Sequence, residues 1–236
     1  MCPPQRGDET MALLTKRETA EVVARLAERY PDAKCALNFT TPFELLIATM
    51  LSAQCTDARV NMVTARLFQK YQGPRAFATA TPEQMAEDIR EVGLFRTKAQ
   101  NIVATARILL EKYGGEVPKN REQLVELPGV GRKTANVVLS NAFGIPAFAV
   151  DTHVQRVTNR IGIVKSDDPL KTEEQACRKL PREMWTQAHH LFIHHGRQIC
   201  VARKPKCDIC PVSELCHYAR EQVRLAAGNQ RRKAEP

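Results

Sequence analysis

The sequence lacks any long apolar run and any clear strand pattern. No segment approaches the ~18 consecutive apolar residues that a membrane-spanning helix requires, although 43% of the 236 residues are hydrophobic. The N-terminus also lacks the basic start and long apolar core of a secretory signal. These absences exclude a membrane partner and predict a globular protein of the cytoplasm.

Helical patterns cover most of the chain, and no hairpin signal interrupts them. Thr41-Pro42 and Thr81-Pro82 are typical of an N-cap followed by proline in the first helical position. Thr56 and Asn120 stand at similar starts. We predict an all-α fold with polar, disordered tails at 1–15 and 221–236. The expected helices are 17–30, 42–53, 57–71, 82–92, 97–113, 121–127, 131–143, 152–161, 169–180 and 182–198.

The charge balance favours an acidic partner. The formal net charge is +9 and the isoelectric point is about 9.3. Nucleic acid is the commonest partner of such a basic protein, although charge alone does not select it.

One segment, LPGVGRKTANVVLSNAFGIPAFAVDTH at 127–153, joins two expected helices by a glycine turn. Glycine permits positive φ and a close approach of the backbone to a ligand. The turn amides and the positive end of the following helix would together bind one phosphate. Such a helix-hairpin-helix would grip DNA without reading its bases. The alternative is a plain tight turn between packed helices.

Lys133 follows this turn, and Asp151 lies eighteen residues later. The intervening helix rises roughly 15 Å, and residues 144–151 can span ~25 Å in return. The chain can therefore bring Asp151 back to Lys133. Desolvation would lower the pKa of the amine and make it a nucleophile able to form a Schiff base, with the carboxylate stabilising a developing positive charge. The alternative is a solvated lysine and an N-capping aspartate.

Four of the eight cysteines fall within seventeen residues, in the pattern Cys200-x6-Cys207-x2-Cys210-x5-Cys216. Four thiolates suit an iron–sulfur cluster or a tetrahedral zinc ion. Only one pair has the CxxC spacing, which favours a 4Fe–4S cluster over a zinc ribbon. The loop also carries three cations that suggest phosphate contact, Arg203, Lys204 and Lys206.

A second cluster of potential ligands is formed by four histidines, His189, His190, His194 and His195. Their helical spacing would permit a metal site. Packed and surface imidazoles are the preferred interpretation, because the cysteines already complete a four-ligand set.

Three motifs together resemble the endonuclease III family of helix-hairpin-helix DNA glycosylases. They are LPGVGRKTA, VDTHVQRVTNR and the cysteine loop, and LLIATMLSAQCTD adds a fourth similarity. The resemblance spans roughly 17–220. It implies a six-helix domain at 35–145 and a cluster domain built from 16–34 and 146–220, with a DNA cleft between them. It also implies one 4Fe–4S cluster held by the four cysteines.

The same resemblance implies a role for each site residue. Lys133 would attack C1′ of an extruded, oxidised pyrimidine nucleotide, Asp151 would assist, and β-elimination would cut the strand. Gln54 would fill the space left by the base, and Leu94 would wedge the opposite strand. Further DNA contacts are expected at Leu127, Gly129, Val130, Gly131, Arg132, Thr134, Arg203, Lys204 and Lys206.

The partner implied is double-stranded DNA with damaged bases or abasic sites, bound by a monomer that is nucleoid-associated if the source is bacterial. The related adenine glycosylase carries a catalytic glutamate where this chain has Thr49, and it lacks the lysine found here at Lys133. A monofunctional glycosylase and a non-catalytic iron–sulfur DNA-binding protein are the alternatives.

Overall fold

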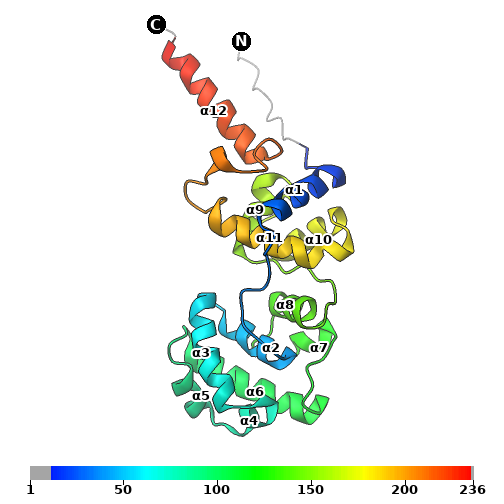
Figure 1. The fold of residues 1–236 in the computed structure, drawn as a ribbon, viewed down its shortest axis with the longest axis vertical. Coiled ribbons are helices and arrows are strands. Elements are labelled where there is room, and N and C mark those ends of the chain that lie inside the picture. The colour runs from blue at the N-terminus through cyan, green and yellow to red at the C-terminus, as the bar shows by residue number, and fades with distance from the viewer. Residues whose placement is uncertain (1–11, 235–236) are drawn as a thin grey trace, which may run out of the picture. The chain divides into compact units, whose positions relative to one another are not determined.

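The computed structural model describes residues 12–234, and within that range the chain is helical with no strand (Figure 1). This confirms the all-α prediction. The helices are α1 (Lys16–Arg29), α2 (Pro42–Leu51), α3 (Asp57–Lys70), α4 (Gly73–Thr79), α5 (Pro82–Asp88), α6 (Phe95–Tyr113), α7 (Arg121–Val125), α8 (Arg132–Ala142), α9 (Thr152–Ile161), α10 (Pro169–Lys179), α11 (Trp185–Gln198) and α12 (His217–Ala234), with 3-10 turns η1 (Arg182–Met184) and η2 (Cys207–Ile209).

The chain forms two compact units. Unit 1 comprises Met1–Ala33, Val150–Pro181 and Ala188–Pro236, and unit 2 comprises Lys34–Ala149 with Arg182–Gln187. Unit 2 therefore contains α2 to α8, and unit 1 contains α1, α9, α10, α12 and most of α11.

The core of unit 2 is built around α2, whose residues from Phe43 to Leu51 are all buried except Glu44. An apolar helix of this kind must be covered on every side. Accordingly, α2 packs against α3, α4, α6 and α8, and α6 packs against α4 and α5. Phe43 and Phe77 meet edge to face with ring centroids 5.1 Å apart, a favoured aromatic geometry.

The first helix of unit 1 is fixed at its start by a capping box. The Thr15 hydroxyl accepts from the Glu18 amide, and the Glu18 carboxylate accepts from the Thr15 amide at 2.8 Å. The preceding Leu14 is buried, and its amide donates to the Gly162 carbonyl at 2.9 Å. The predicted tail at 1–15 is therefore ordered at its end, and residues 1–11 lie outside the described part of the chain.

Four predicted N-caps are confirmed. Thr41, Thr56, Thr81 and Asn120 each accept a hydrogen bond from a backbone amide in the first turn of the helix that follows. Such side chains satisfy amides that have no partner within the helix. These short polar signals account for the accuracy of the predicted helix starts.

Two predictions about helix ends are wrong. The helix expected to run to residue 92 ends at Asp88, because the chain turns there and buries Ile89 and Val92. The tail expected from residue 221 is helical to Ala234. Its Arg, Glu, Gln, Leu and Ala residues have high helix propensity, which outweighs the scarcity of apolar residues.

Candidate functional site

The predicted glycine turn joins α7 to α8 in unit 2. The Val130 amide donates to the Leu127 carbonyl at 3.0 Å, which closes the turn. Gly129 has φ +76°, and a Cβ added there would stand 2.7 Å from Nδ2 of Asn101. Glycine is therefore required at 129 by both conformation and space. Thr105 on α6 donates to the Pro128 carbonyl at 3.1 Å and holds the turn from behind.

The turn presents the start of α8 to solvent. Gly131 is the N-cap and provides no side-chain hydrogen bond, so the first turn of α8 offers its amides and its positive dipole end to an anion. Gly131, Arg132 and Lys133 are exposed. Leu127 and Val130 are buried at 2% and 5% exposure, so any contact they make with DNA must come from the backbone. Gly129 is exposed, and Thr134 is half-buried.

Lys133 lies in the first turn of α8, directly after the glycine turn. Its side chain is exposed, so the desolvation expected from the sequence is not supplied by its own unit. Burial raises the pKa of the neighbouring Cys35 thiol, and the charges of Asp57 and Lys133 modify it in opposite directions. Lys133 and Asp57, the first residue of α3, therefore both lie near Cys35.

The segment after α8 returns along that helix. The Ile145 amide donates to the Leu139 carbonyl at 3.0 Å, and Nδ2 of Asn136 donates to the Phe148 carbonyl at 3.0 Å. Asn136 stands three residues after Lys133. The return expected from chain length is thus present within unit 2 as far as Ala149.

Asp151 is the N-cap of α9 in unit 1, which is the role that the alternative interpretation of this residue expects. One carboxylate oxygen accepts from the amides of His153 and Val154, both at 2.8 Å. Only Oδ1 makes these two bonds. The capping role therefore orients the carboxylate without occupying Oδ2.

Gln54 and Leu94 occupy two exposed turns of unit 2. Both have left-handed backbones, with φ of 54° and 56°. Non-glycine residues rarely adopt this conformation, and it costs of order 1 kcal/mol or more. The side chain of Leu94 remains 59% exposed. An exposed leucine on a strained turn suits insertion into a partner better than it suits packing.

The four predicted ligand cysteines lie in one loop of unit 1 between α11 and α12. Cys200 and Cys216 are buried, while Cys207 and Cys210 are half-buried. Burial, and then the negative charge of the other thiolates, raises the pKa of Cys210 to about 11. Burial likewise raises the pKa values of Cys207 and Cys216.

In residues 12–234 no group of three or more His, Cys, Asp or Glu side chains is arranged to hold a single metal ion. The donor set itself fits an iron–sulfur cluster. Four neighbouring thiols disfavour one another's ionisation because the resulting thiolates repel. The positive charge of bound iron would offset this repulsion and stabilise the four thiolates.

Two arginines of α9 bind the cysteine loop. The Arg160 guanidinium donates to the carbonyls of Val201 and Ala202 at 2.7 and 2.8 Å and approaches the Cys200 sulfur at 3.7 Å. Arg156 donates to the Cys200 carbonyl at 3.1 Å. Helix α9, which Asp151 caps at its start, is therefore bonded to the cysteine loop through side chains of its later turns.

One of the four predicted histidine positions also touches the loop. Nε2 of His195 lies 3.6 Å from the Cys210 sulfur, and Nδ1 lies 3.2 Å from the Tyr30 hydroxyl. Burial lowers the pKa of His195 to about 4. His189, His190 and His195 are buried, in agreement with packed imidazoles.

The three loop cations Arg203, Lys204 and Lys206 are exposed. Lys204 has a left-handed backbone with φ 54°. They belong to unit 1 with Asp151 and the cysteines, whereas Lys133, the glycine turn, Gln54 and Leu94 belong to unit 2.

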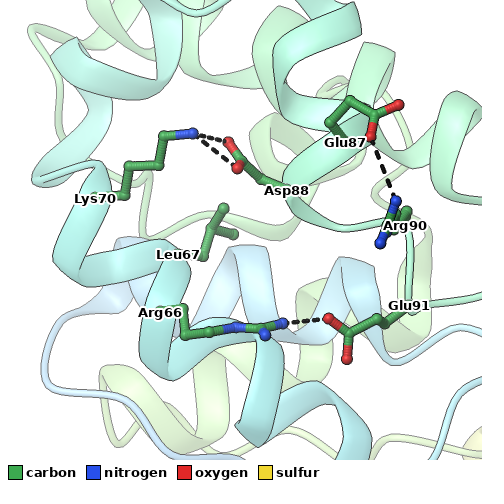
Figure 2. Close-up of a pocket in the computed structure, with 7 residues that line it drawn as sticks. All are labelled: Arg66, Leu67, Lys70, Glu87, Asp88, Arg90 and Glu91. Atoms are coloured by element: carbon green, nitrogen blue, oxygen red, sulfur yellow. Dashed lines mark hydrogen bonds and ion pairs between the residues drawn. The ribbon is translucent and has the colours of Figure 1, made fainter.

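A hollow of about 350 Å³ in unit 2 lies between α3, the end of α5 and the turn that follows α5 (Figure 2). Its charges are paired with one another. Lys70 meets both carboxylate oxygens of Asp88 at 2.7 Å, Arg66 pairs with Glu91, and Arg90 lies 3.9 Å from Glu87. The charges of these three cations and three carboxylates therefore balance within the hollow. None of the helices in the described range is long and apolar enough to cross a membrane.

Comparison with known proteins gives two family matches. Residues 47–182 match the HhH-GPD superfamily of base excision DNA repair proteins. Residues 200–216 match the iron–sulfur binding domain of endonuclease III, and this range begins and ends at Cys200 and Cys216.

Curated relatives cover most of the chain. Endonuclease III of Bacillus subtilis (strain 168) is 46% identical over 211 residues, which cover 89% of this chain and 96% of the relative. Endonuclease III of Escherichia coli (strain K12) is 46% identical over 205 residues, which cover 87% and 97%.

Solved structures share the fold. A trapped endonuclease III–DNA covalent intermediate with an estranged adenine has a TM-score of 0.85 and 48% identity, covering 89% of this chain and all of that one. A thermostable thymine-DNA glycosylase has a TM-score of 0.78 and 28% identity, covering 87% and 98%.

Proposed function

Because this chain belongs to the endonuclease III family of base excision DNA repair proteins, we propose that Lys133 is its nucleophile and Asp151 the carboxylate that assists it. The protein is a bifunctional DNA glycosylase and abasic-site lyase that carries one 4Fe–4S cluster. One observation carries the assignment of Lys133. It is an exposed amine in the first turn of α8, immediately beside the phosphate-binding end of that helix.

The chemistry assigned to Lys133 is a two-stage reaction. Its neutral amine attacks C1′, the bond from C1′ to the base breaks, and the base departs with a proton. The bond from C1′ to O4′ then breaks with protonation of O4′, and the lysine nitrogen keeps its remaining proton in a protonated Schiff base, the iminium. Removal of a C2′ proton then expels the 3′ phosphate and cuts the strand. Bound DNA would supply the desolvation that the exposed Lys133 lacks on its own.

Asp151 is assigned the electrostatic part of the reaction. The sugar gains positive charge as the base leaves, and a fixed carboxylate lowers the energy of that state. The hydrogen bonds donated by the backbone amides of His153 and Val154 hold the carboxylate in one orientation. Preorganisation of this kind removes the need to reorient the group during the reaction.

DNA is the partner of this family, and contacts are assigned in both units. The glycine turn is assigned to phosphate binding through the backbone amides of Gly129 and Gly131, assisted by Arg132 and Thr134. The amides of Leu127 and Val130 bond to carbonyls of the chain, and these two residues shape the turn. The exposed cations Arg203, Lys204 and Lys206 bind phosphate from the cysteine loop. We assign the helix-hairpin-helix domain to 35–145 and the cluster domain to 16–34 with 146–220, with DNA bound between them.

Gln54 and Leu94 are assigned to base extrusion. An enzyme acting on a stacked base must take it out of the duplex and pay for the lost stacking. Gln54 would occupy the vacated position and Leu94 would separate the opposite strand. Their exposure and strained backbones support this assignment.

The cluster ligands are assigned to Cys200, Cys207, Cys210 and Cys216. We expect Cys210→Ser to abolish the sulfur-to-iron absorption, which lies at about 400 nm in such sites, and to lower the thermal stability of the protein. Serine provides no thiolate ligand, so the cysteine loop loses one of its bonds to the cluster and is less firmly held. Absorption spectra and iron content of the purified variant measure this.

Cys177→Ser is the matched control, since Cys177 is a half-buried cysteine of the same unit outside the loop. It should retain its colour. An unchanged spectrum in Cys210→Ser would contradict the ligand assignment.

The substrate assigned is double-stranded DNA with an oxidised pyrimidine, bound by a monomer. A panel of duplexes with one oxidised pyrimidine, one oxidised purine or one abasic site tests this. Base release and strand cleavage are scored separately at single turnover. We expect both steps with oxidised pyrimidines, cleavage of abasic sites, and no release of oxidised purines. Base release without strand cleavage would contradict the lyase assignment.

A further inference from the structure

Lys98 is a buried lysine that the sequence analysis does not select. It lies on α6 with 6% exposure. Its ammonium group donates to the Leu51 carbonyl at 2.9 Å and to the Ala53 carbonyl at 2.7 Å. A lysine side chain is seldom buried unless its charge is satisfied. These two bonds cross between segments more than forty residues apart in sequence.

The ammonium group of Lys98 lies at the end of α2, where the chain enters the Gln54 turn. Carbonyls at a helix C-terminus carry partial negative charge and favour a cation. The Ala53 carbonyl shares a planar peptide unit with the Gln54 nitrogen. The hydrogen bond from Lys98 to the Ala53 carbonyl therefore fixes the orientation of the peptide plane that precedes the left-handed φ of Gln54.

The backbone of Lys98 reaches the second turn. Its amide donates to the Leu94 carbonyl at 3.0 Å, which is the first helical bond of α6. Leu94 is also left-handed and has no side-chain cap. The two turns are adjacent, because a methyl group added to Gly93 would stand 3.6 Å from the Gln54 carbonyl oxygen. One residue thus connects both strained turns.

A direct chemical role does not fit this geometry. Burial lowers the pKa of the Lys98 ammonium, as it would for a nucleophile, but the side chain is enclosed and two of its donors are engaged. It presents no amine to a substrate. The contacts instead fit a support for Gln54 and Leu94.

We propose that Lys98 is a positioning residue that holds the Gln54 and Leu94 turns in the arrangement needed to enter the duplex during base extrusion. This rests on the proposed function of those two turns. Strained turns persist only where the surroundings over-determine them. The lysine supplies that constraint from inside the unit.

The test compares a duplex with a substrate that requires no extrusion. Lys98→Met keeps the length of the side chain and removes the donors, and Lys98→Gln retains a donor.

Lys179→Met is the matched control, because Lys179 is a half-buried lysine of unit 1 that donates to the Leu14 carbonyl at 2.6 Å. Gln54→Ala and Leu94→Ala serve as references for the turns themselves. Thermal unfolding and the cluster spectrum are recorded for each purified protein.

Two rates are measured at single turnover. One is base excision from a duplex carrying an oxidised pyrimidine, and the other is borohydride trapping on single-stranded abasic DNA. We expect Lys98→Met to slow duplex excision about tenfold or more while trapping stays within about twofold of wild type, because a small misplacement impairs insertion and not the amine. The duplex excision rate of Lys98→Gln should lie between those of wild type and Lys98→Met. If Lys98→Met does not fold, Lys98→Gln is used for the comparison instead. Lys179→Met should match wild type in both assays.

Equal losses on both substrates would show a merely structural role and overturn the proposal, as would unimpaired duplex excision in the folded Lys98 variants. Duplex excision unaffected by Gln54→Ala and Leu94→Ala would instead refute the function proposed for the turns. Impairment in those two variants without impairment at Lys98 would refute the role of Lys98 alone.

Discussion

Lys133→Ala is expected to abolish the covalent adduct with abasic DNA under borohydride and to lower strand cleavage at least about a thousandfold, as loss of a nucleophile does in covalent catalysis. Alanine cannot form a Schiff base, so β-elimination has no iminium intermediate to proceed through. Gel separation of trapped and cleaved DNA measures both effects. The fold should survive, because Lys133 is exposed in the first turn of α8.

Lys119→Ala provides the control for this variant. Lys119 is also an exposed lysine of unit 2, placed 5.4 Å from the Phe143 ring centre. It should trap abasic DNA at the wild-type rate. An undiminished adduct in Lys133→Ala would show that another amine performs the chemistry.

The second large effect is expected at Asp151→Asn. Asparagine caps a helix as well as aspartate does, so the bonds to His153 and Val154 can be kept while the charge is lost. Base release should fall about a hundredfold or more if the carboxylate stabilises the charged sugar. The midpoint of thermal unfolding should change little. Single-turnover kinetics on an oxidised-pyrimidine duplex, with a parallel unfolding scan, measures the two effects.

Asp168→Asn is a matched control for the loss of charge. Asp168 caps α10 in the same unit and accepts from the amides of Leu170 and Lys171 at 2.7 and 3.0 Å. It should leave base release unchanged. Asp151→Ala should also lose about 1 kcal/mol of stability through the missing cap. If Asp151→Asn excises bases at the wild-type rate, the aspartate serves only as a cap.

Local signals in the sequence predict much of this fold. Threonine and asparagine caps fix helix starts because they bond to amides only two or three residues away. Gly129 was predictable for a similar reason, since positive φ excludes most other residues. The cysteine spacing indicated the cluster, because four thiolates within one short loop have few other uses.

Features set by tertiary contact were not predictable. The end of α5 depends on burial of Ile89 and Val92 by other helices. The burial of Leu127 and Val130 changes how the glycine turn can touch DNA. Lys98 resembles any helical lysine in sequence, and only the fold brings it to the carbonyls of Leu51 and Ala53.

The central claim is that Lys133 forms the covalent bond to the sugar. Its most direct test is peptide mapping by mass spectrometry of the borohydride-trapped protein after nuclease and protease digestion. The sugar remnant should be found on the peptide that contains Lys133 and on that lysine within it. A remnant on any other lysine, or on the N-terminal amine, would contradict the account.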